Sequence, residues 1–260
     1  MTSERAADTR FGVLLSVRYD GTRFSGFARQ PSARTVAGEL DGAVKAIDPR
    51  ASLVRGASRT DAGVHAFDQR VAFDTAMDIP SRGWVLALGR HLGDDVAVAR
   101  ASRVAPAYDP RAHALKKTYR YVVLQSPVRD PFYRDRACLV RDRLNHALMA
   151  DEARALVGTH DFRAFRTSMD ARAETVRTIF RADVWLESTR ILVIEVDGDR
   201  FLHRMVRIIA GTLIDVGRGR LAAGASRRGI ESGQRGVLGT TAPACGLYLA
   251  AIDLDDEAEW

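Results

Sequence analysis

The alternation of strand-like and helix-like segments limits the fold of this chain more tightly than any other feature of its sequence. Phe11–Tyr19 has the apolar and β-branched content of a strand, and Thr35 is a candidate helix N-cap, followed by apolar residues in helical spacing. The first half therefore predicts the order βαββαβ, with helices after Thr35 and at residues 81–91, and strands at residues 11–19, 52–55, 67–74 and 95–104.

A similar order of elements follows in the second half. Strands are expected at residues 117–125, 175–186, 191–196 and 246–254, and helices at residues 144–157 and 201–216. At about 150 residues per domain, 260 residues correspond to two domains, and Pro106–Pro110 is the expected boundary between them. We predict an α+β protein with antiparallel sheets and helices on one face, divided into domains 1–108 and 109–260.

The chain has an excess of arginine. Lysine and arginine together number 39 against 33 acidic residues, the net charge is +6, and only Lys45, Lys116 and Lys117 are lysines. Eight arginines lie between Arg200 and Arg235, against two acidic residues. Arginine binds phosphate through paired hydrogen bonds and stacks on bases, so a polyanionic partner is the leading hypothesis. A solvated charged face is the alternative.

The sequence gives no support to several other classes of site. Cys138 and Cys245 lie far apart and the six histidines have no ligand spacing, so we expect neither a disulfide framework nor a metal site. Gly217–Gly224 departs from G-x-G-x-x-G, so no nucleotide cofactor is expected. No stretch approaches 18 apolar residues and the first ten residues do not resemble a signal peptide, which predicts a cytoplasmic protein without membrane contact.

One loop contains a candidate catalytic group. Gly56–Ala66 reads G-A-S-R-T-D-A-G-V-H-A between two expected strands. In such a loop Asp61 could simply cap nearby backbone N–H groups. Arg59 lies two residues before Asp61, and a cation beside a loop carboxylate keeps it ionised and oriented, as a nucleophile or base requires.

The segment R-T-D-A-G-V-H-A at Arg59–Ala66 resembles, without mismatch, the signature of the TruA-type pseudouridine synthases. The resemblance extends over almost the whole chain. Other blocks similar to that family occur in family order: Y-D-G-T at 19–22, R-T-V-x-G-E-L at 34–40, K-x-Y-R-Y at 117–121, G-x-H-D-F at 158–162, F-L-x-x-M-V-R at 201–207 and T-A-P-A-x-G-L-Y-L at 241–249.

The resemblance implies roles for four residues. Asp61 matches the catalytic aspartate, which attacks uridine or its ribose while the N-glycosidic bond is exchanged for a C–C bond. Tyr119 matches the tyrosine that packs against the target base and helps to remove the C5 proton. Arg59 and Arg207 match arginines that pair with the aspartate or enter the space left by the flipped base. A base inside a duplex must leave its stack to be reached, which agrees with these roles.

The resemblance also implies a substrate and an architecture. The expected substrate is tRNA, modified in the anticodon stem-loop at positions 38 to 40 without a cofactor, by a homodimer. Besides Tyr119, RNA contacts are expected at Lys117, Arg204, Arg218 and Arg220. The expected fold has two ferredoxin-like βαββαβ units, whose antiparallel sheets pack side by side with the active-site cleft between them.

The chain departs from the family pattern at four positions. Phe27 and Ala28 replace a usual W-Q, Gly89 follows Leu88 where the family has L-N, and Gly93 follows Leu92 where L-P is frequent. None of them belongs to the expected chemistry. Such positions could shape the substrate cleft or a dimer contact.

Three other functions compete with this one. The first is a non-catalytic RNA-binding or RNA-folding module on the same basic scaffold, with Asp61 as a loop cap; the aromatic R-G-F-x-F-V-x-F stretch of an RRM is absent. The second is a pseudouridine synthase for a different RNA. The third is a carboxylate-dependent nucleoside hydrolase, which would release free base where an isomerase would not.

Overall fold

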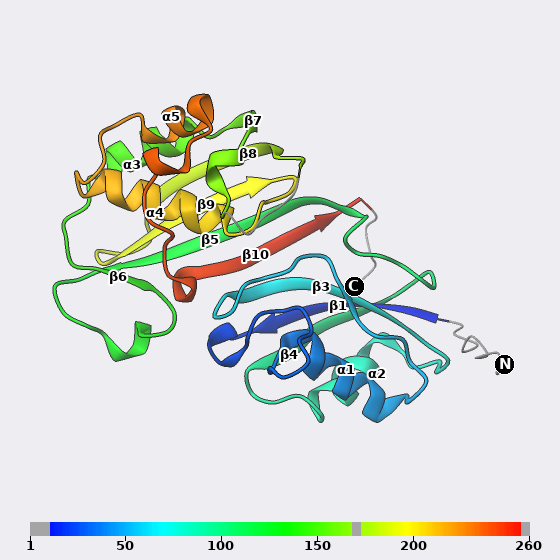
Figure 1. Cartoon of the computed structure of the whole chain (residues 1–260). Coiled ribbons are helices and arrows are strands. Elements are labelled where there is room, and N and C mark those ends of the chain that lie inside the picture. Colours follow the sequence, from blue (N-terminus) through cyan, green and yellow to red (C-terminus); the bar gives the residue numbers. More distant parts are fainter. Residues whose placement is uncertain (1–10, 168–172, 256–260) are drawn as a thin grey trace. The chain divides into compact units, whose positions relative to one another are not determined.

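The computed structural model describes residues 11–167 and 173–255 (Figure 1). By their contacts these residues form two units: the first runs to Leu115 and resumes at Ala251, and the second is Lys116–Ala250. This division differs from one at residue 108 in two ways: the first boundary follows Leu115, and the chain returns to the first unit after residue 250. There Arg70 Nε donates to the Ile252 carbonyl (3.3 Å), and the Asp255 N–H donates to the His113 carbonyl (2.9 Å).

The first unit has the expected βαββαβ order. Its strands pair antiparallel in the order β4-β1-β3, and β2 also pairs with β3. Helices α1 and α2 lie on one side of these strands in Figure 1. The elements are β1 (Phe11–Tyr19), α1 (Val36–Ile47), β2 (Arg55–Gly56), β3 (His65–Thr75), α2 (Ser81–Gly89) and β4 (Val96–Val104), with a 3₁₀ turn η1 (Gly21–Arg23) after β1.

Local sequence explains most of these elements. The Thr35 hydroxyl accepts a hydrogen bond from the Gly38 N–H (3.2 Å), which confirms the expected N-cap of α1. Trp84 of α2 packs edge-on against Phe73 of β3, with ring centroids 5.0 Å apart. The strand expected at 52–55 is confirmed only at Arg55, and it continues to Gly56. The Val54 N–H is taken by the Asp41 carboxylate (2.8 Å), and regular pairing is confined to β2.

The second unit has a longer series of elements. Its strands follow the order β10-β5-β9-β8-β7, and β6 pairs parallel with β5. The elements are β5 (Ala114–Gln125), η2 (Pro131–Tyr133), β6 (Cys138–Val140), α3 (His146–Arg154), β7 (Gly158–Asp161), η3 (Arg163–Phe165), β8 (Val176–Leu186), β9 (Ile191–Gly198), α4 (Met205–Gly217), α5 (Ala225–Ser232), η4 (Arg235–Val237), η5 (Ala244–Gly246) and β10 (Leu247–Leu254).

Two helices of this unit differ from expectation. Helix α4 begins at Met205 rather than Phe201, because Arg204 has a left-handed backbone with φ of 60°. Helix α5 was not expected from the sequence. Its first turn has no capping side chain of its own, and the Glu152 carboxylate of α3 accepts hydrogen bonds from the Gly224 and Ser226 N–H groups instead.

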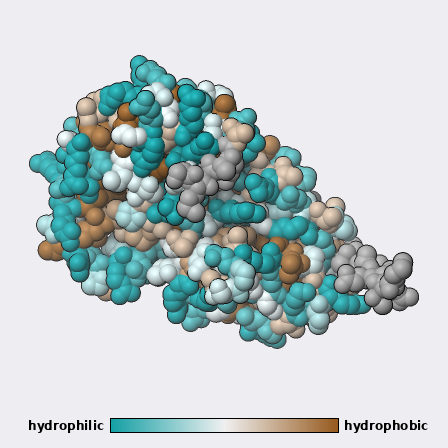
Figure 2. Space-filling model, viewed as in Figure 1, coloured by the Kyte–Doolittle hydropathy of each residue, from teal (hydrophilic) through white to brown (hydrophobic). Residues whose placement is uncertain are grey.

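Polar residues cover most of the face shown in Figure 2, in keeping with a charged content of 28%. Among residues 11–167 and 173–255, none of the helices has the length and apolar composition needed to cross a bilayer.

Candidate active-site residues

In the loop between β2 and β3, buried residues alternate with more accessible ones from Ser58 to Asp61. Ser58 and Thr60 are each only 8% exposed, whereas Arg59 is exposed and Asp61 is half-buried. The alternation matches an extended backbone, in which successive side chains point to opposite sides. The loop therefore brings Arg59 and Asp61 towards accessible positions, while Ser58 and Thr60, which alternate with them, are buried.

Hydrogen bonds from three other segments fix the anchored residues. The buried Gln69 amide accepts from the Ser58 N–H (3.1 Å) and donates to the Ser58 carbonyl (2.8 Å). The Thr60 hydroxyl shares a buried hydrogen bond with the Tyr19 hydroxyl (2.8 Å), and the Thr60 carbonyl accepts from the Phe27 N–H (3.1 Å). Buried polar groups are costly when unpaired, so these bonds strongly favour one loop conformation.

The segment after β1 packs backbone to backbone against this loop. A Cβ on Gly21 would lie 2.0 Å from the Val64 carbonyl oxygen, and one on Gly26 would lie 2.8 Å from that of Thr60. Gly26 also has φ of 99°, which L side chains rarely adopt. Glycine is therefore required at both positions for the loop to lie where it does.

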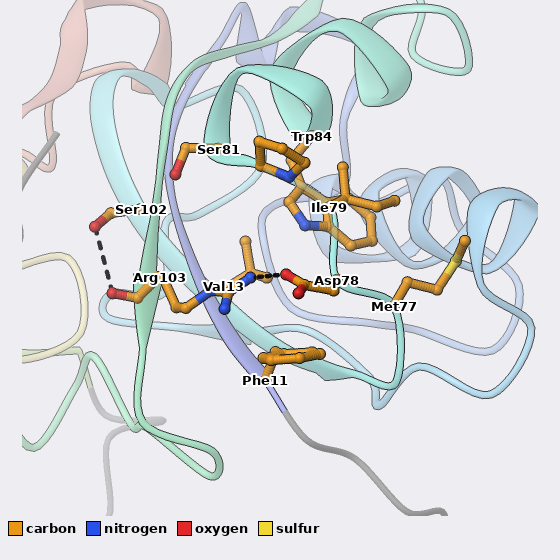
Figure 3. Close-up of a pocket in the computed structure, with 10 residues that line it drawn as sticks. Phe11, Val13, Met77, Asp78, Ile79, Ser81, Trp84, Ser102 and Arg103 are labelled. Atoms are coloured by element: carbon orange, nitrogen blue, oxygen red, sulfur yellow. Dashed lines mark hydrogen bonds and ion pairs between the residues drawn. The ribbon is translucent and has the colours of Figure 1, made fainter.

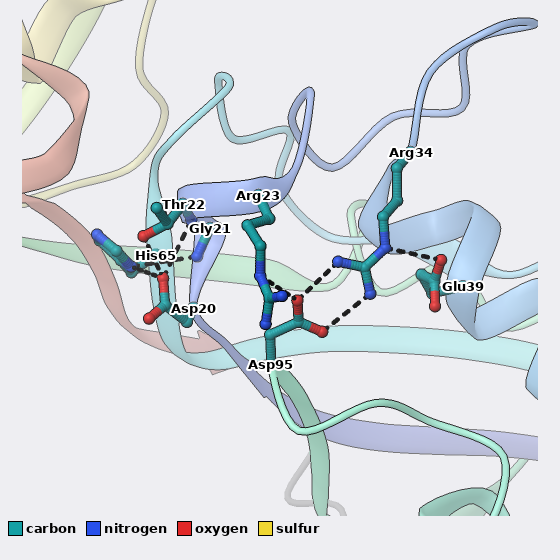
Figure 4. A network of polar contacts seen from close by, with 8 residues as sticks. All are labelled: Asp20, Gly21, Thr22, Arg23, Arg34, Glu39, His65 and Asp95. Carbon is teal, nitrogen blue, oxygen red and sulfur yellow. Dashed lines mark hydrogen bonds and ion pairs between the residues drawn. The ribbon is translucent and has the colours of Figure 1, made fainter. Parts of the chain in front are cut away.

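A polar network holds the same segment in place (Figure 4). Arg34 binds both oxygens of Asp95 (2.6 and 3.0 Å), and its Nε donates to Glu39 (3.1 Å). Hydrogen bonding to the Arg34 guanidinium lowers the pKa of the Asp95 carboxyl below its usual value. At the other side of the network the Gly21 N–H donates to Nδ1 of the buried His65 (3.1 Å).

The four departures from the family pattern lie in two places. Phe27 is buried, its ring packs against Gly56, and its centroid is 6.4 Å from that of Tyr19. Ala28 beside it is half-buried. Gly89 and Gly93 are exposed, at the end of α2 and before β4. Phe27 therefore supports the base of the Asp61 loop.

In the second unit, Lys117 and Tyr119 lie on one face of β5 and are both buried. The Tyr119 ring packs edge-on against Phe201, with centroids 5.0 Å apart. Tyr121, two residues on, is fully buried and its hydroxyl donates to the Pro243 carbonyl (2.9 Å). Burial raises the pKa of Tyr121 well above its usual value. Tyr121 is thus a core residue, whereas Tyr119 is the position that matches the family's tyrosine.

Arg207 lies in the first turns of α4 and is half-buried. Its Nε donates to the Ala242 carbonyl (2.8 Å), and its own carbonyl accepts from the Ala242 N–H (3.0 Å). These two bonds tie the helix to the segment before β10. The bond from Nε restrains the orientation of the guanidinium, whereas the guanidinium of an unbonded surface arginine can turn freely.

The other predicted RNA-contact arginines lie in different surroundings. Arg204 is exposed at the strained residue before α4. Arg218 and Arg220 both approach the Asp142 carboxylate, at 3.0 and 3.3 Å, so that Asp142 offsets part of their charge. No sequence feature links Asp142 to these arginines, because it lies more than 70 positions from both.

Arg227 is exposed on α5, and Arg227→Ala is expected to weaken binding of all RNA sequences alike. Removal of one phosphate-binding side chain should lower the slope of log K against log salt by about one. Arg220→Ala should lower it less, because Asp142 already offsets its charge. Binding isotherms at several salt concentrations measure this, with the exposed Arg82→Ala of α2 as control. An unchanged slope for Arg227→Ala would exclude Arg227 from the phosphate contacts.

A pocket of about 300 Å³ lies elsewhere in the first unit (Figure 3). Phe11, Trp84 and Arg103 are among the residues lining it, and the Arg103 guanidinium stacks 4.3 Å above the Phe11 ring. None of the predicted site residues lines this pocket. Phe11 begins β1 and Tyr19 ends it, so the two lie roughly 25 Å apart at the usual rise of a strand.

The predicted catalytic residues thus belong to two units, Arg59 and Asp61 to the first and Tyr119 and Arg207 to the second. Tyr19 and Gln69, which hold the loop, had no predicted role, although Tyr19 opens the Y-D-G-T block. In the part of the chain that the structure describes, no cluster of three or more histidine, cysteine or acidic side chains could hold a metal ion.

Comparison with known proteins identifies the family. A family model described as tRNA pseudouridine synthase matches residues 153–255. The chain is 39% identical to tRNA pseudouridine synthase A of Bacillus subtilis (strain 168), over 93% of this chain and 98% of the relative. It is 40% identical to tRNA pseudouridine synthase A of Acetivibrio thermocellus, over 92% of this chain and 98% of the relative.

Among solved structures, a chain from a Cbf5-Nop10-Gar1 complex aligns with 78% of this chain and 45% of its own length, at 12% identity and a TM-score of 0.34. That similarity is too low to support a conclusion. The identity of about 40% over nearly the full length of both proteins shows that this chain belongs to the tRNA pseudouridine synthase A family.

Proposed function

We propose that Asp61 is the nucleophile with which this pseudouridine synthase isomerises uridine in the anticodon stem-loop of tRNA, at positions 38 to 40. The observation that carries the proposal is the geometry of the Asp61 loop. A half-buried carboxylate follows two anchored residues, Ser58 and Thr60, whose backbone and side chains are fixed by buried hydrogen bonds. Such preorganisation is what a nucleophile needs, and a simple loop cap does not require it.

The reaction exchanges one bond for another. The bond between N1 of uracil and C1′ of ribose breaks, a bond between C5 and C1′ forms, and the C5 proton is lost to solvent while N1 gains one. No electrons are gained or lost. If the Asp61 carboxylate attacks the ribose, the N1–C1′ bond breaks as an ester forms at C1′, and C5 of the turned base displaces that ester as the C–C bond forms. If it attacks the base, it adds to the ring, and the adduct is eliminated after the N1–C1′ bond has been exchanged for the C5–C1′ bond.

The other predicted residues would act on the flipped base and its backbone. Tyr119 offers a ring against which uracil can stack, and a hydroxyl for the C5 proton. Arg207, with its guanidinium fixed by the Ala242 carbonyl, would stabilise the base once it is out of its stack. Arg59 would pair with Asp61 or with a phosphate, and Lys117 and Arg204 would contact the RNA backbone.

The finer architecture is part of the proposal. The first unit's strand order, β4-β1-β3 with β2 beyond β3, supports a ferredoxin-like description. In the second unit, β10-β5-β9-β8 has the corresponding order, with β7 added at its edge. We propose that the enzyme acts in the cytoplasm. We also propose that it is a homodimer, and light scattering on the purified protein would test this oligomeric state.

Release of tritium from tRNA labelled at C5 of uridine is the experiment that tests the activity. The expected result is stoichiometric release together with pseudouridine in the anticodon stem-loop, and no free uracil. EDTA should leave the rate unchanged, because neither redox nor Lewis-acid chemistry is part of the proposed steps. A transcript whose uridines at positions 38 to 40 are replaced by cytidine is the matched control.

Each other outcome would point elsewhere. Free uracil would indicate a nucleoside hydrolase, and binding without release would indicate an RNA-binding module. Tritium release from the cytidine-substituted control would show that the enzyme modifies a uridine outside positions 38 to 40. A loss of turnover with EDTA that zinc or magnesium restores, on tRNA refolded identically, would introduce a metal.

A further inference from the structure

A buried pair of hydroxyl groups lies one residue from the proposed nucleophile. Tyr19 ends β1 and Thr60 directly precedes Asp61. Their hydroxyl oxygens are 2.8 Å apart, and the two residues are 5% and 8% exposed. Both residues belong to the first unit. The Gln69 amide binds Ser58, three residues before Asp61, whereas the Tyr19 hydroxyl binds Thr60, the residue directly before it.

The tyrosine is a rigid point from which to hold the loop. The backbone of Tyr19 pairs with Ala66 of β3 on one side and with Val96 of β4 on the other. Its ring lies against Phe27, at 6.4 Å between centroids. A residue whose backbone is paired on both sides and whose ring is packed in the core has little freedom to follow a moving loop.

The geometry of the loop makes the orientation of Thr60 decisive for the carboxylate. The Thr60 carbonyl is held by the Phe27 N–H, and the Asp61 carbonyl accepts from the Val64 N–H (3.2 Å). These backbone bonds set the path of the chain. The hydrogen bond to the Tyr19 hydroxyl adds a side-chain restraint on the same residue. A rotation of the Thr60 backbone that redirected Asp61 would therefore also break this hydrogen bond.

We propose that Tyr19 is a positioning residue for the isomerisation, which through its bond to Thr60 holds the Asp61 carboxylate in its reactive direction. This inference rests on the proposed role of Asp61. Small misplacements of a reacting group can lower rates by up to about a hundredfold. RNA affinity depends mainly on phosphate contacts, to which neither hydroxyl contributes, so it should be unaffected.

Tyr19→Phe removes a single oxygen and tests the proposal. We expect the single-turnover rate constant at saturating enzyme to fall about tenfold, within the range that misplacement produces, while the dissociation constant for tRNA changes by less than about twofold. Thr60→Val should reproduce the loss, and Thr60→Ser, which keeps a hydroxyl, should retain most of the rate. The double variant Tyr19→Phe/Thr60→Val should be no slower than Thr60→Val alone, because both changes remove the same bond.

Tyr248→Phe is the matched control. Tyr248 is also buried, at 7% exposed, and its hydroxyl donates to the Arg136 carbonyl (2.7 Å) in the second unit. This control should lose a similar amount of thermal stability and keep the parental single-turnover rate. If Tyr19→Phe does not fold, the contrast between Thr60→Val and Thr60→Ser decides the question.

Three results would overturn the positioning role: a parental rate in Tyr19→Phe, an equal loss of rate in Tyr248→Phe, or multiplicative losses in the double variant. Failure of the proposed function has a different signature. In that case the parent enzyme forms no pseudouridine, or Asp61→Asn keeps the parental rate. An inactive Asp61→Asn together with a fully active Tyr19→Phe would remove only the role of Tyr19.

Discussion

Asp61→Asn is expected to bind tRNA like the parent enzyme and to lose pseudouridine formation by about four orders of magnitude or more. Asparagine has the shape of aspartate but cannot act as a carboxylate nucleophile, and losses of this size follow removal of a nucleophile in other enzymes. The loop should keep its conformation, because buried hydrogen bonds on Ser58 and Thr60 anchor it. Nucleoside analysis of tRNA after long incubation measures the residual rate.

A control for this change lies in another loop of the same unit. Asp109 is exposed and its carboxylate accepts from the Arg111 N–H (2.9 Å), which is the ordinary role of a loop aspartate. Asp109→Asn should leave the rate unchanged. If Asp61→Asn kept a rate within about tenfold of the parent, Asp61 would be a loop cap as well, and the chemistry would belong to another group.

Arg207→Ala is expected to lower the single-turnover rate about a hundredfold while leaving the salt dependence of tRNA binding nearly unchanged. A guanidinium held by the Ala242 carbonyl is preorganised, and we expect its interaction to strengthen only after the base has left its stack. Arg207→Lys should restore little of the rate, since an ammonium group cannot reproduce a planar fork of donors. Single-turnover kinetics and binding isotherms at several salt concentrations separate the two effects.

The matched control is Arg200→Ala. Arg200 is exposed near the start of the same arginine-rich stretch and approaches Asp199 at 3.7 Å. Its removal should not change the rate of chemistry. A normal rate combined with a reduced salt slope in Arg207→Ala would place Arg207 among the phosphate contacts instead of the active site.

The sequence predicted those elements whose determinants are local. The strand Phe11–Tyr19 and the N-cap Thr35 are confirmed because a short apolar, β-branched run and a capping hydroxyl act within a few residues. Helix α5 could not be predicted in this way, since its cap is the Glu152 carboxylate, more than 70 residues earlier. The start of α4 was predicted too early, because nothing in the sequence indicates the left-handed backbone of Arg204.

The same distinction applies to the candidate site. The loop with Arg59 and Asp61 could be located, because glycine-rich turn chemistry and a short motif are sequence features. The contacts that hold it could not: Tyr19 meets Thr60 from 41 positions away, and Gln69 binds Ser58 from the next strand. Likewise, the pairing of Arg218 and Arg220 with Asp142 depends on how the segment before α3 packs against the segment that follows α4.

The amide clamp of Gln69 on Ser58 also affects how this part of the chain moves. The Gln69 amide binds both the N–H and the carbonyl of Ser58. In a regular sheet, the backbone N–H and carbonyl of a residue on the neighbouring strand would make these two bonds. A rotamer change that moves the Gln69 amide away from Ser58 therefore breaks both bonds at once. Fluctuations three residues before Asp61 should consequently be rare, discrete openings rather than continuous fraying, and each reclosure requires only one side chain to return.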